Sequence, residues 1–290
     1  MSEDLYGEAI SFFESSMRTK AFSIRPLEGG TGNAIFLINL DSVLRLHKEN
    51  RVDAPFYNPR HEYETTLHLS SKATPRLIPQ AFVFDPENGN KIERFIAEKE
   101  ASHETDATYR YYLSLIDTLH RFHELTPKVP SFYPFERFDH YKKLSGESIR
   151  LDYETLILEK TTEVFDASPI VFCHNDLHKG NLLLDSKDNR MKLLDLEMAG
   201  YNYEIFDVAS FIEENELPYR LAERLIHAYY GIKNATAKTV ENVLLVGEFL
   251  DLLWYYWAKA RYNETLNQTF LDIAKVKMGR IAKNIRHRFG

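Results

Sequence analysis

The stretch CHNDLHKGNLLLDSKDNRMKLLDLE, residues 173–197, holds the densest cluster of polar side chains in an otherwise apolar part of the chain. Its two short apolar runs, NLLLD and MKLLDL, flank SKDNR, and this pattern predicts a β-hairpin. In such a hairpin Asn181 opens one strand and Asp195 ends the other, so we expect both side chains near one rim. Asp176 stands five residues before Asn181, on the loop that leads to this rim.

The spacing of this cluster is H-x-D-x-x-x-x-N from His174 to Asn181, followed by D-x-E from Asp195 to Glu197. Carboxylate and amide oxygens are ligands that a hard cation such as Mg²⁺ prefers. Phosphoryl transfer needs such ligands to hold the phosphates, and a carboxylate to orient the attacking hydroxyl and accept its proton. The alternative is a polar surface loop and an ordinary strand end. The position of the motif, after the apolar strand PIVFC and before a hairpin, favours the catalytic interpretation.

Composition narrows the class of protein. The chain has 290 residues, 44% of them hydrophobic, which is enough for one large core or two smaller lobes. A net charge of −7 argues against a general nucleic-acid binder. The single cysteine, Cys173, excludes an internal disulfide, no apolar run approaches the length of a membrane span, and the first residues do not resemble a secretory signal. We therefore expect a cytoplasmic protein.

The hydrophobic periodicity changes along the chain. Residues 20–97 predict a small α+β unit, in which short antiparallel strands surround one helix at about residues 60–71 and PENGN forms a hairpin turn. Helices are expected at 3–16, 107–125 and 153–165, and throughout the chain beyond Ile205. Three prolines between Thr126 and Phe138 predict a loop.

Several motifs together resemble the choline/ethanolamine kinases, within the wider aminoglycoside-phosphotransferase-like group. The resemblance covers roughly residues 25–280, and it is carried by these stretches: VFCHNDLHKGNLLLD, LLDLEMAGYNYEIFDVASFIEE, LEGGTGNAIFLI, VLRLHK and LLWYYW. It implies an α+β, two-lobed, protein-kinase-like fold, with a small antiparallel-sheet N-lobe and a larger, mainly helical C-lobe. It also implies ATP and Mg²⁺ as cofactors and a small amino alcohol as substrate. We place the nucleotide-binding lobe at residues 1–97 and the catalytic and acceptor-binding lobe at 98–290.

The resemblance implies a role for each residue of the opening motif. Asp176 resembles the catalytic base, and His174 resembles the residue that supports its loop. Asn181 and Asp195 resemble the magnesium ligands. Glu197 matches the second acidic position of D-x-E, near both the metal and the acceptor.

The resemblance also implies a nucleotide site. Arg45 occupies the position of a phosphate-contacting lysine in protein kinases, and a forked guanidinium suits phosphate oxygens. Its acidic partner is Glu62 or Glu64. The segment Glu93-Arg94-Phe95-Ile96 lies where the backbone would contact adenine. A glycine-containing loop would offer N–H groups to phosphate, although by itself it reads equally well as a β-turn. Its residues are Gly29, Gly30, Thr31, Gly32 and Asn33.

The acceptor is expected to be a small molecule. Asp195 and Asp207 are only twelve positions apart, which leaves no room for the activation segment with which protein kinases bind peptides. Trp254 and Trp257 share one face of a predicted helix, with Asp251 one turn earlier.

Two indole rings beside a carboxylate would suit a quaternary ammonium through cation–π attraction. An aromatic stripe is otherwise more typical of a core. The resemblance places both tryptophans at the acceptor wall and Glu213 at an acidic position near it.

Some alternatives stay open. Met198 stands where choline kinases often carry Tyr, and Tyr201 or Tyr203 would have to compensate. The acceptor is choline in our preferred interpretation, with ethanolamine or another small alcohol (an aminoglycoside, thiamine or a sugar) as the alternative. A non-catalytic nucleotide-binding module is the third hypothesis. The sequence leaves the oligomeric state open between a monomer and a homodimer.

Overall fold

A computed structural model of the chain describes residues 3–27, 33–48, 50, 52–72, 76–98 and 105–289. Its internal contacts divide the chain into two compact units. Unit 1 comprises Met1–Asn50, Tyr57–Val129 and Gly180–Glu197, and unit 2 comprises Arg51–Phe56, Pro130–Lys179 and Met198–Gly290. We placed a boundary between residues 97 and 98 according to function. Unit 1 includes residues on both sides of it, so the units do not test this boundary, and it stays a prediction.

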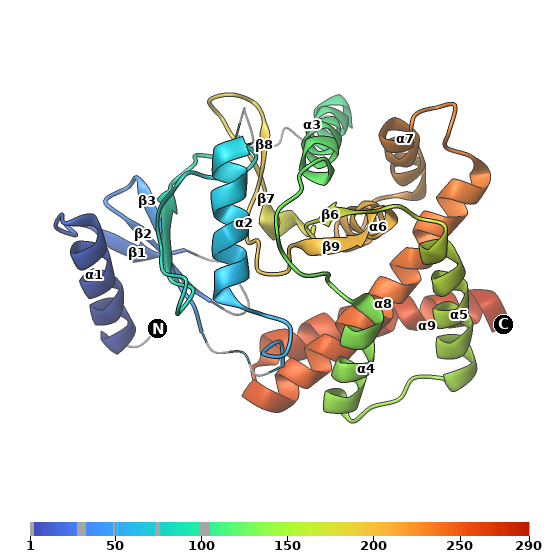
Figure 1. The fold of residues 1–290 in the computed structure, drawn as a ribbon. Coiled ribbons are helices and arrows are strands. Elements are labelled where there is room, and N and C mark those ends of the chain that lie inside the picture. The colour runs from blue at the N-terminus through green and yellow to red at the C-terminus, as the bar shows by residue number, and fades with distance from the viewer. Residues whose placement is uncertain are drawn as a thin grey trace. The chain divides into compact units, whose positions relative to one another are not determined.

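Unit 1 is built on an antiparallel sheet with the strand order β1-β2-β3-β5-β4 (Figure 1). The strands are β1 (Ile24–Pro26), β2 (Ala34–Ile38), β3 (Ser42–Leu46), β4 (Ala81–Phe84) and β5 (Lys91–Arg94). This order confirms the predicted antiparallel strands and the hairpin around PENGN. In the register of β3 and β5, Arg45 stands opposite Lys91.

The two faces of this sheet serve different purposes, because side chains alternate along a strand. Phe36, Leu44 and Ile92 point to one face and form a core with Phe13 of helix α1 (Glu3–Met17). Arg45 and Lys91 point to the opposite face, where α2 (Pro59–Lys72) lies (Figure 1). One face of the sheet thus provides stability and the other carries buried charge.

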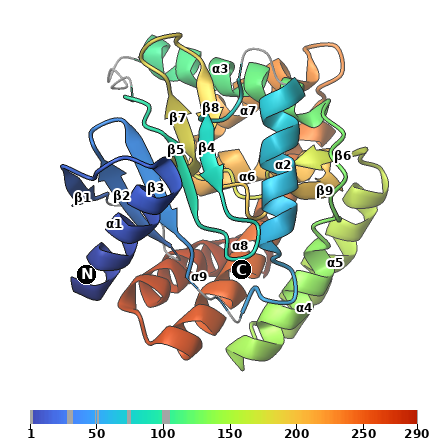
Figure 2. The same cartoon turned by 60° about the vertical axis from the view of Figure 1, so that its left-hand side comes forward.

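The predicted hairpin of the opening motif also lies in unit 1. Strands β7 (Leu182–Leu184) and β8 (Met191–Leu193) pair with Leu182 opposite Leu193, and the short 3₁₀ helix η1 (Lys179–Asn181) precedes them. Helix α3 (Thr105–His123) packs beside them, and the Thr118 hydroxyl donates to the carbonyl of Met191 (Figure 2).

Unit 2 is mainly helical and is arranged around one long helix, α8 (Figure 1). Its helices are α4 (Pro134–Ser145), α5 (Leu151–Asp166), α6 (Glu204–Glu214), α7 (Tyr219–Tyr230), α8 (Ala237–Thr265) and α9 (Gln268–Phe289). A two-stranded sheet pairs β6 (Ile170–Cys173) with β9 (Gly200–Tyr203). Packed aromatic rings form the core, including those of Phe138, Phe165 and Phe249.

Two elements of unit 2 differ from the expectation. The predicted loop from Thr126 to Phe138 ends early, because α4 already begins at Pro134, and proline is favoured at the first position of a helix. Strand β9 was not predicted. Gly200 opens it where a Cβ would lie 2.8 Å from the carbonyl oxygen of Pro130, so the close chain approach there requires glycine. In the described part of the chain, no helix has the length and apolar character that crossing a bilayer requires.

Candidate active site

The first part of the candidate site lies on the charged face of the unit 1 sheet and centres on Arg45, which is 4% exposed. Its Nη2 lies 2.6 Å from Oε2 of Glu62 and donates to the carbonyl of Gly89 at 3.0 Å. Its Nη1 lies 3.1 Å from Oδ1 of Asp195. The partner on α2 is therefore Glu62, whereas Glu64 is exposed.

A second buried cation supports the same carboxylate. Lys91 Nζ lies 3.3 Å from Oε1 of Glu62 and 3.1 Å from Oε1 of Glu93. Burial alone would raise the pKa of Glu62, but Arg45 and Lys91 outweigh it and lower that pKa to about 2. Burial likewise opposes the charged form of Arg45, yet Glu62 and Asp195 raise its pKa above the ordinary value. Both members of the pair stay ionised at neutral pH.

The turn at Gly89 allows a close approach within this cluster. A Cβ at this position would lie 2.7 Å from the hydroxyl of Tyr57, and the φ of +80° also favours glycine. The Tyr57 hydroxyl donates to Glu62 at 3.2 Å, and its ring stacks on His47 at 4.7 Å. Tyr57, Gly89 and Lys91 thus surround the Arg45–Glu62 pair. None of the three was predicted as a site residue, although Gly89 belongs to the predicted PENGN turn.

The rim of the β7–β8 hairpin carries the expected metal ligands of unit 1. The backbone N–H of Leu194 donates to the carbonyl of Asn181 at 2.9 Å, so the strand ends that carry Asn181 and Asp195 are adjacent. Glu197 accepts a hydrogen bond from the amide of Asn33 at 3.4 Å. An amide oxygen and two carboxylates are the hard donors that Mg²⁺ prefers, so this set fits the ion chemically.

The structure describes only some of the remaining residues predicted to bind the nucleotide. Gly29, Gly30, Thr31 and Gly32 lie outside the described residues. The side chain of Glu93 is engaged by Lys91. The backbone N–H groups of Arg94 and Phe95 donate to the carbonyls of Gln80 and Asp41, at 2.8 and 2.7 Å. Neither group is therefore turned outward to a nucleotide.

The loop predicted to carry the catalytic base belongs to unit 2 up to Lys179, and a buried carboxylate holds it. Asp207 is wholly buried and accepts the backbone N–H groups of His174 and Asn175, each at 2.7 Å. Asn175 adopts a left-handed conformation with φ +67°. Its amide nitrogen donates to the carbonyls of Met198 and Gly200, at 2.9 and 3.3 Å. The loop that carries Asp176 is thus tied to the chain after the D-x-E motif.

Asp176 itself is half-buried. Its backbone N–H donates to Nδ1 of the fully buried His174 at 3.3 Å. Its Oδ2 lies 3.7 Å from Nε2 of His178. The carboxylate is therefore on a loop with a well-defined backbone but keeps access to solvent.

The aromatic residues of the expected acceptor wall lie together in unit 2. The rings of Trp254 and Trp257 meet edge to face, with centroids 6.0 Å apart, and Phe270 of α9 meets Trp257 in the same way at 5.5 Å. Trp254 is 7% exposed, whereas Trp257 is more accessible. The indole N–H of Trp257 donates to Oδ2 of Asp53 at 3.0 Å.

The two acidic residues predicted near the acceptor are bound to cations of α9. Asp251 lies 3.2 Å from Lys277 and 3.3 Å from Arg280, and Glu213 lies 3.2 Å from the same arginine. Glu214 contacts Lys277 at 2.5 Å. Burial raises the pKa of Asp251 to about 7, despite the opposing effect of Lys277. These ion pairs connect helices α6, α8 and α9.

Met198, which directly follows the D-x-E motif and departs from the family pattern, is also buried. Met198 receives the Nη1 of Arg137 on its sulfur at 3.5 Å. Tyr203 stacks on Phe165 with centroids 4.2 Å apart and so takes part in core packing. Arg137 and its neighbours Asp53 and Tyr141 were not predicted as site residues, because a buried polar residue inside an irregular loop or on a helix leaves no periodic signal.

An antiparallel sheet with a buried Arg–Glu pair, combined with a loop held by a buried aspartate, defines a two-lobed α+β protein of protein-kinase-like fold, as predicted. The profile of the choline/ethanolamine kinase family matches residues 24–251, so the chain belongs to the choline/ethanolamine kinase family. It is an enzyme of the small-molecule kinase class, which transfers phosphate from a nucleotide to an alcohol.

Individual relatives agree with this assignment. The chain is 27% identical to the protein LicA of Haemophilus influenzae over 261 residues, which cover 85% of this chain and 75% of LicA. A choline/ethanolamine kinase family protein from Mesorhizobium loti superposes with a TM-score of 0.78 at 22% identity, covering 97% of this chain and 95% of that one. The choline kinase LicA from Streptococcus pneumoniae gives 0.75 at 17% identity, over 97% and 100%.

Proposed function

We propose that this kinase uses Mg²⁺ and ATP to phosphorylate the hydroxyl of choline. The observation that carries the choice of acceptor is the aromatic cluster of Trp254, Trp257 and Phe270, in which Trp257 stays accessible. A quaternary ammonium cannot donate hydrogen bonds, so aromatic faces are its natural ligands, each contributing about 1–2 kcal/mol when desolvated. The name of the Streptococcus pneumoniae choline kinase supports the same acceptor.

The proposed reaction is an in-line displacement. The carboxylate of Asp176 orients the acceptor hydroxyl and accepts its proton as the hydroxyl oxygen attacks the γ-phosphorus. The bond from the γ-phosphorus to the bridging oxygen breaks, and ADP leaves. Bound Mg²⁺ supplies positive charge that stabilises the phosphate oxygens, and Asn181, Asp195 and Glu197 would hold it. Asp207 and Asn175 would hold the loop of Asp176 in place.

Arg45 is the proposed phosphate ligand in unit 1. Its ion pair with Glu62 and its contact with Asp195 keep the guanidinium charged and oriented. The adenine would form hydrogen bonds with the backbone at Ile96, because the N–H groups of Arg94 and Phe95 already donate to carbonyls within unit 1. The glycine-containing loop would cover the phosphates. A cytoplasmic location, where ATP is available and the buried Cys173 stays reduced, belongs to the same proposal.

The test is a coupled ADP-release assay with the full chain and a panel of acceptors: choline, ethanolamine, thiamine, a sugar and an aminoglycoside. We expect the highest kcat/KM with choline. Asp176→Asn should lower kcat by about 10²–10⁴ and leave the fold intact, whereas Asp166→Asn, at an exposed helix end, should have no effect. Full turnover by Asp176→Asn would contradict its role.

The same panel separates the alternatives. The buried Met198 supports another acceptor, because a thioether replaces the phenol that choline kinases often carry there. Turnover of ethanolamine or another alcohol, but not of choline, would establish that alternative. Nucleotide binding without turnover of any acceptor would instead favour a non-catalytic module.

A further inference from the structure

A short segment of chain carries a buried acid into unit 2. Residues 51–56 belong to unit 2, although the chain before and after them belongs to unit 1. Asp53 in this segment is 2% exposed. Its Oδ1 accepts from the Tyr141 hydroxyl at 2.5 Å, and its Oδ2 accepts from the indole N–H of Trp257 at 3.0 Å. The two carboxylate oxygens thus bind side chains of two different helices, α4 and α8.

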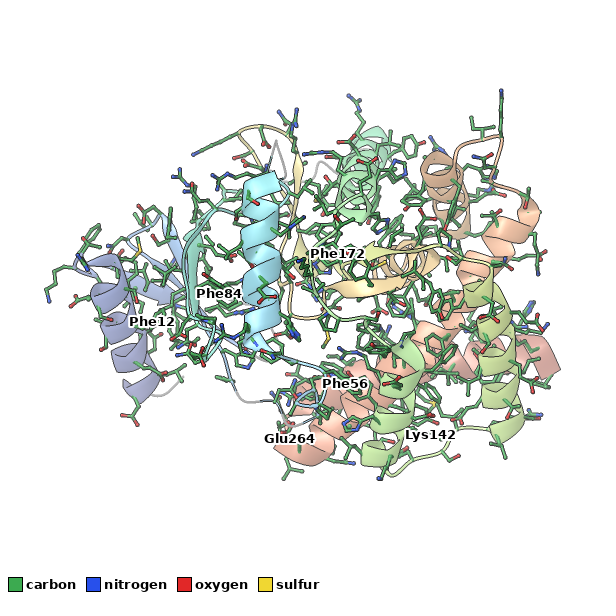
Figure 3. The ribbon with its side chains drawn as sticks, viewed as in Figure 1. Phe12, Phe56, Phe84, Lys142, Phe172 and Glu264 are labelled. Carbon is green, nitrogen blue, oxygen red and sulfur yellow. The ribbon has the colours of Figure 1, made fainter. Side chains whose placement is uncertain are left out.

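A nearby cation and fixed neighbours hold this carboxylate in place. Arg137 Nη1 lies 3.9 Å from Oδ1 of Asp53. The guanidinium lies over the rings of Phe56 and Phe132, at 4.5 and 4.3 Å from their centroids, and its Nε donates to the Phe132 carbonyl (Figure 3 labels Phe56). Burial, reinforced by Asp53, raises the pKa of the Tyr141 phenol, which therefore stays a donor. A buried carboxylate requires such partners, and here Arg137 and Tyr141 compensate for the burial of its Oδ1.

The two tryptophans of the aromatic cluster differ in how they are held. Trp257 is anchored at its N–H edge by Asp53. The Nε1 of Trp254 is buried and, within the described part of the chain, has no hydrogen-bond partner. The accessible ring is therefore the one whose orientation is determined by a charged acceptor.

We propose that Asp53 is the positioning residue of the acceptor wall. It holds the indole of Trp257 by its N–H, so that the ring face is presented in one orientation, and its negative charge at the ring edge strengthens the attraction of that face for a cation. Asp53 acts through Trp257 and does not touch the acceptor. The inference rests on the proposed function, because it assigns the acceptor cation to this ring.

Asp53→Asn tests the proposal at nearly constant side-chain size. We expect the KM for choline to rise about tenfold, because a hydrogen bond to a charged acceptor is lost, while kcat and the KM for ATP change less than about twofold. Tyr141→Phe is the matched control. It removes the other hydrogen bond to the same carboxylate and should lower Tm comparably, yet leave the KM for choline within about twofold. Equal increases of KM in both variants would overturn the proposal in favour of a general loss of packing.

A double-mutant cycle tests whether Asp53 acts through Trp257. In Trp257→Phe the ring has no N–H to donate, so adding Asp53→Asn should raise the KM for choline little further. Fully multiplicative effects would show that Asp53 acts elsewhere and would overturn the proposal.

The chain's two tryptophans allow a direct readout by ¹⁹F NMR of protein labelled with 5-fluorotryptophan. The signal that disappears in Trp257→Phe belongs to Trp257. Asp53→Asn should shift that signal much more than the signal of Trp254, which serves as an internal control. An unshifted Trp257 signal would overturn the proposal.

The two levels of inference fail in different ways. The proposed function fails if the wild-type protein turns over no amino alcohol. The role of Asp53 fails if the wild-type protein does turn over choline and the KM for choline is unchanged in Asp53→Asn.

Discussion

Glu62 lies between two buried cations, with Arg45 2.6 Å from one carboxylate oxygen and Lys91 3.3 Å from the other. Helix α2 thus forms ion pairs with two neighbouring strands of the sheet, β3 and β5. Because burying one unpaired charge is costly, the three side chains depend on one another, and this dependence leads to three of the predictions below.

Glu62→Gln should change how stability depends on pH. The pKa of Glu62 is about 2 in the folded protein against 4.5 as the reference value, so its carboxylate stabilises the fold above that reference, and the contribution disappears as pH falls through the folded value. Urea unfolding of the wild type and the variant should differ by about 3 kcal/mol near neutral pH, and the difference should shrink from about pH 5 to pH 2. A constant difference across this window would contradict the assignment.

Lys91→Met should destabilise the protein by about 3 kcal/mol in urea unfolding at neutral pH, because it removes one partner of a buried ion pair. Lys238→Met provides the control, since that side chain is 74% exposed and lies 3.6 Å from Glu241, itself exposed on the surface. The control should change the free energy of unfolding by less than about 0.5 kcal/mol. Similar losses in both variants would mean that the burial of Lys91 has no energetic role.

Arg45→Lys keeps the charge but loses the fork that contacts Glu62, Gly89 and Asp195 together. A lysine cannot make these contacts at once, so kcat/KM for ATP should fall about a hundredfold while the protein stays folded. Arg25→Lys, at an exposed position on β1 of the same sheet, should be neutral. Wild-type kcat/KM in Arg45→Lys would show that charge alone suffices.

Asn175 should be replaceable by glycine at lower cost than by alanine. Its φ of +67° suits glycine, but glycine lacks the amide that donates to the carbonyls of Met198 and Gly200. We expect kcat to fall about tenfold in Asn175→Gly, because the loop of Asp176 is held less firmly.

Asn175→Ala loses both the amide and the favoured conformation, so it should show a further loss of stability of about 1 kcal/mol. The KM for ATP should not change in either variant. Equal stability of the two variants would show that the left-handed backbone has no cost there.

Local patterns predicted much of the fold. Alternation of apolar side chains identified the sheet of unit 1, and two apolar runs around SKDNR identified the β7–β8 hairpin that brings the chain at Asn181 beside Leu194. Pattern recognition was weaker where a short element follows a loop. Pro134 begins α4 inside a proline-rich stretch, and β9 has only four residues, so neither gave a clear periodic signal.

The sequence by itself indicated the family and the order of most elements, and it predicted the catalytic motif from His174 to Glu197, because these depend on residues close together along the chain. It left the partner of Arg45 open between Glu62 and Glu64, which are two positions apart on one helix and therefore face different directions. The tertiary structure decided this choice.

Only the tertiary structure brought Asp53 to the indole of Trp257, 204 residues away in the sequence. A buried hydrogen bond across such a separation depends on how the whole chain packs, and a polar residue in a loop carries no local sign of the partner it will meet.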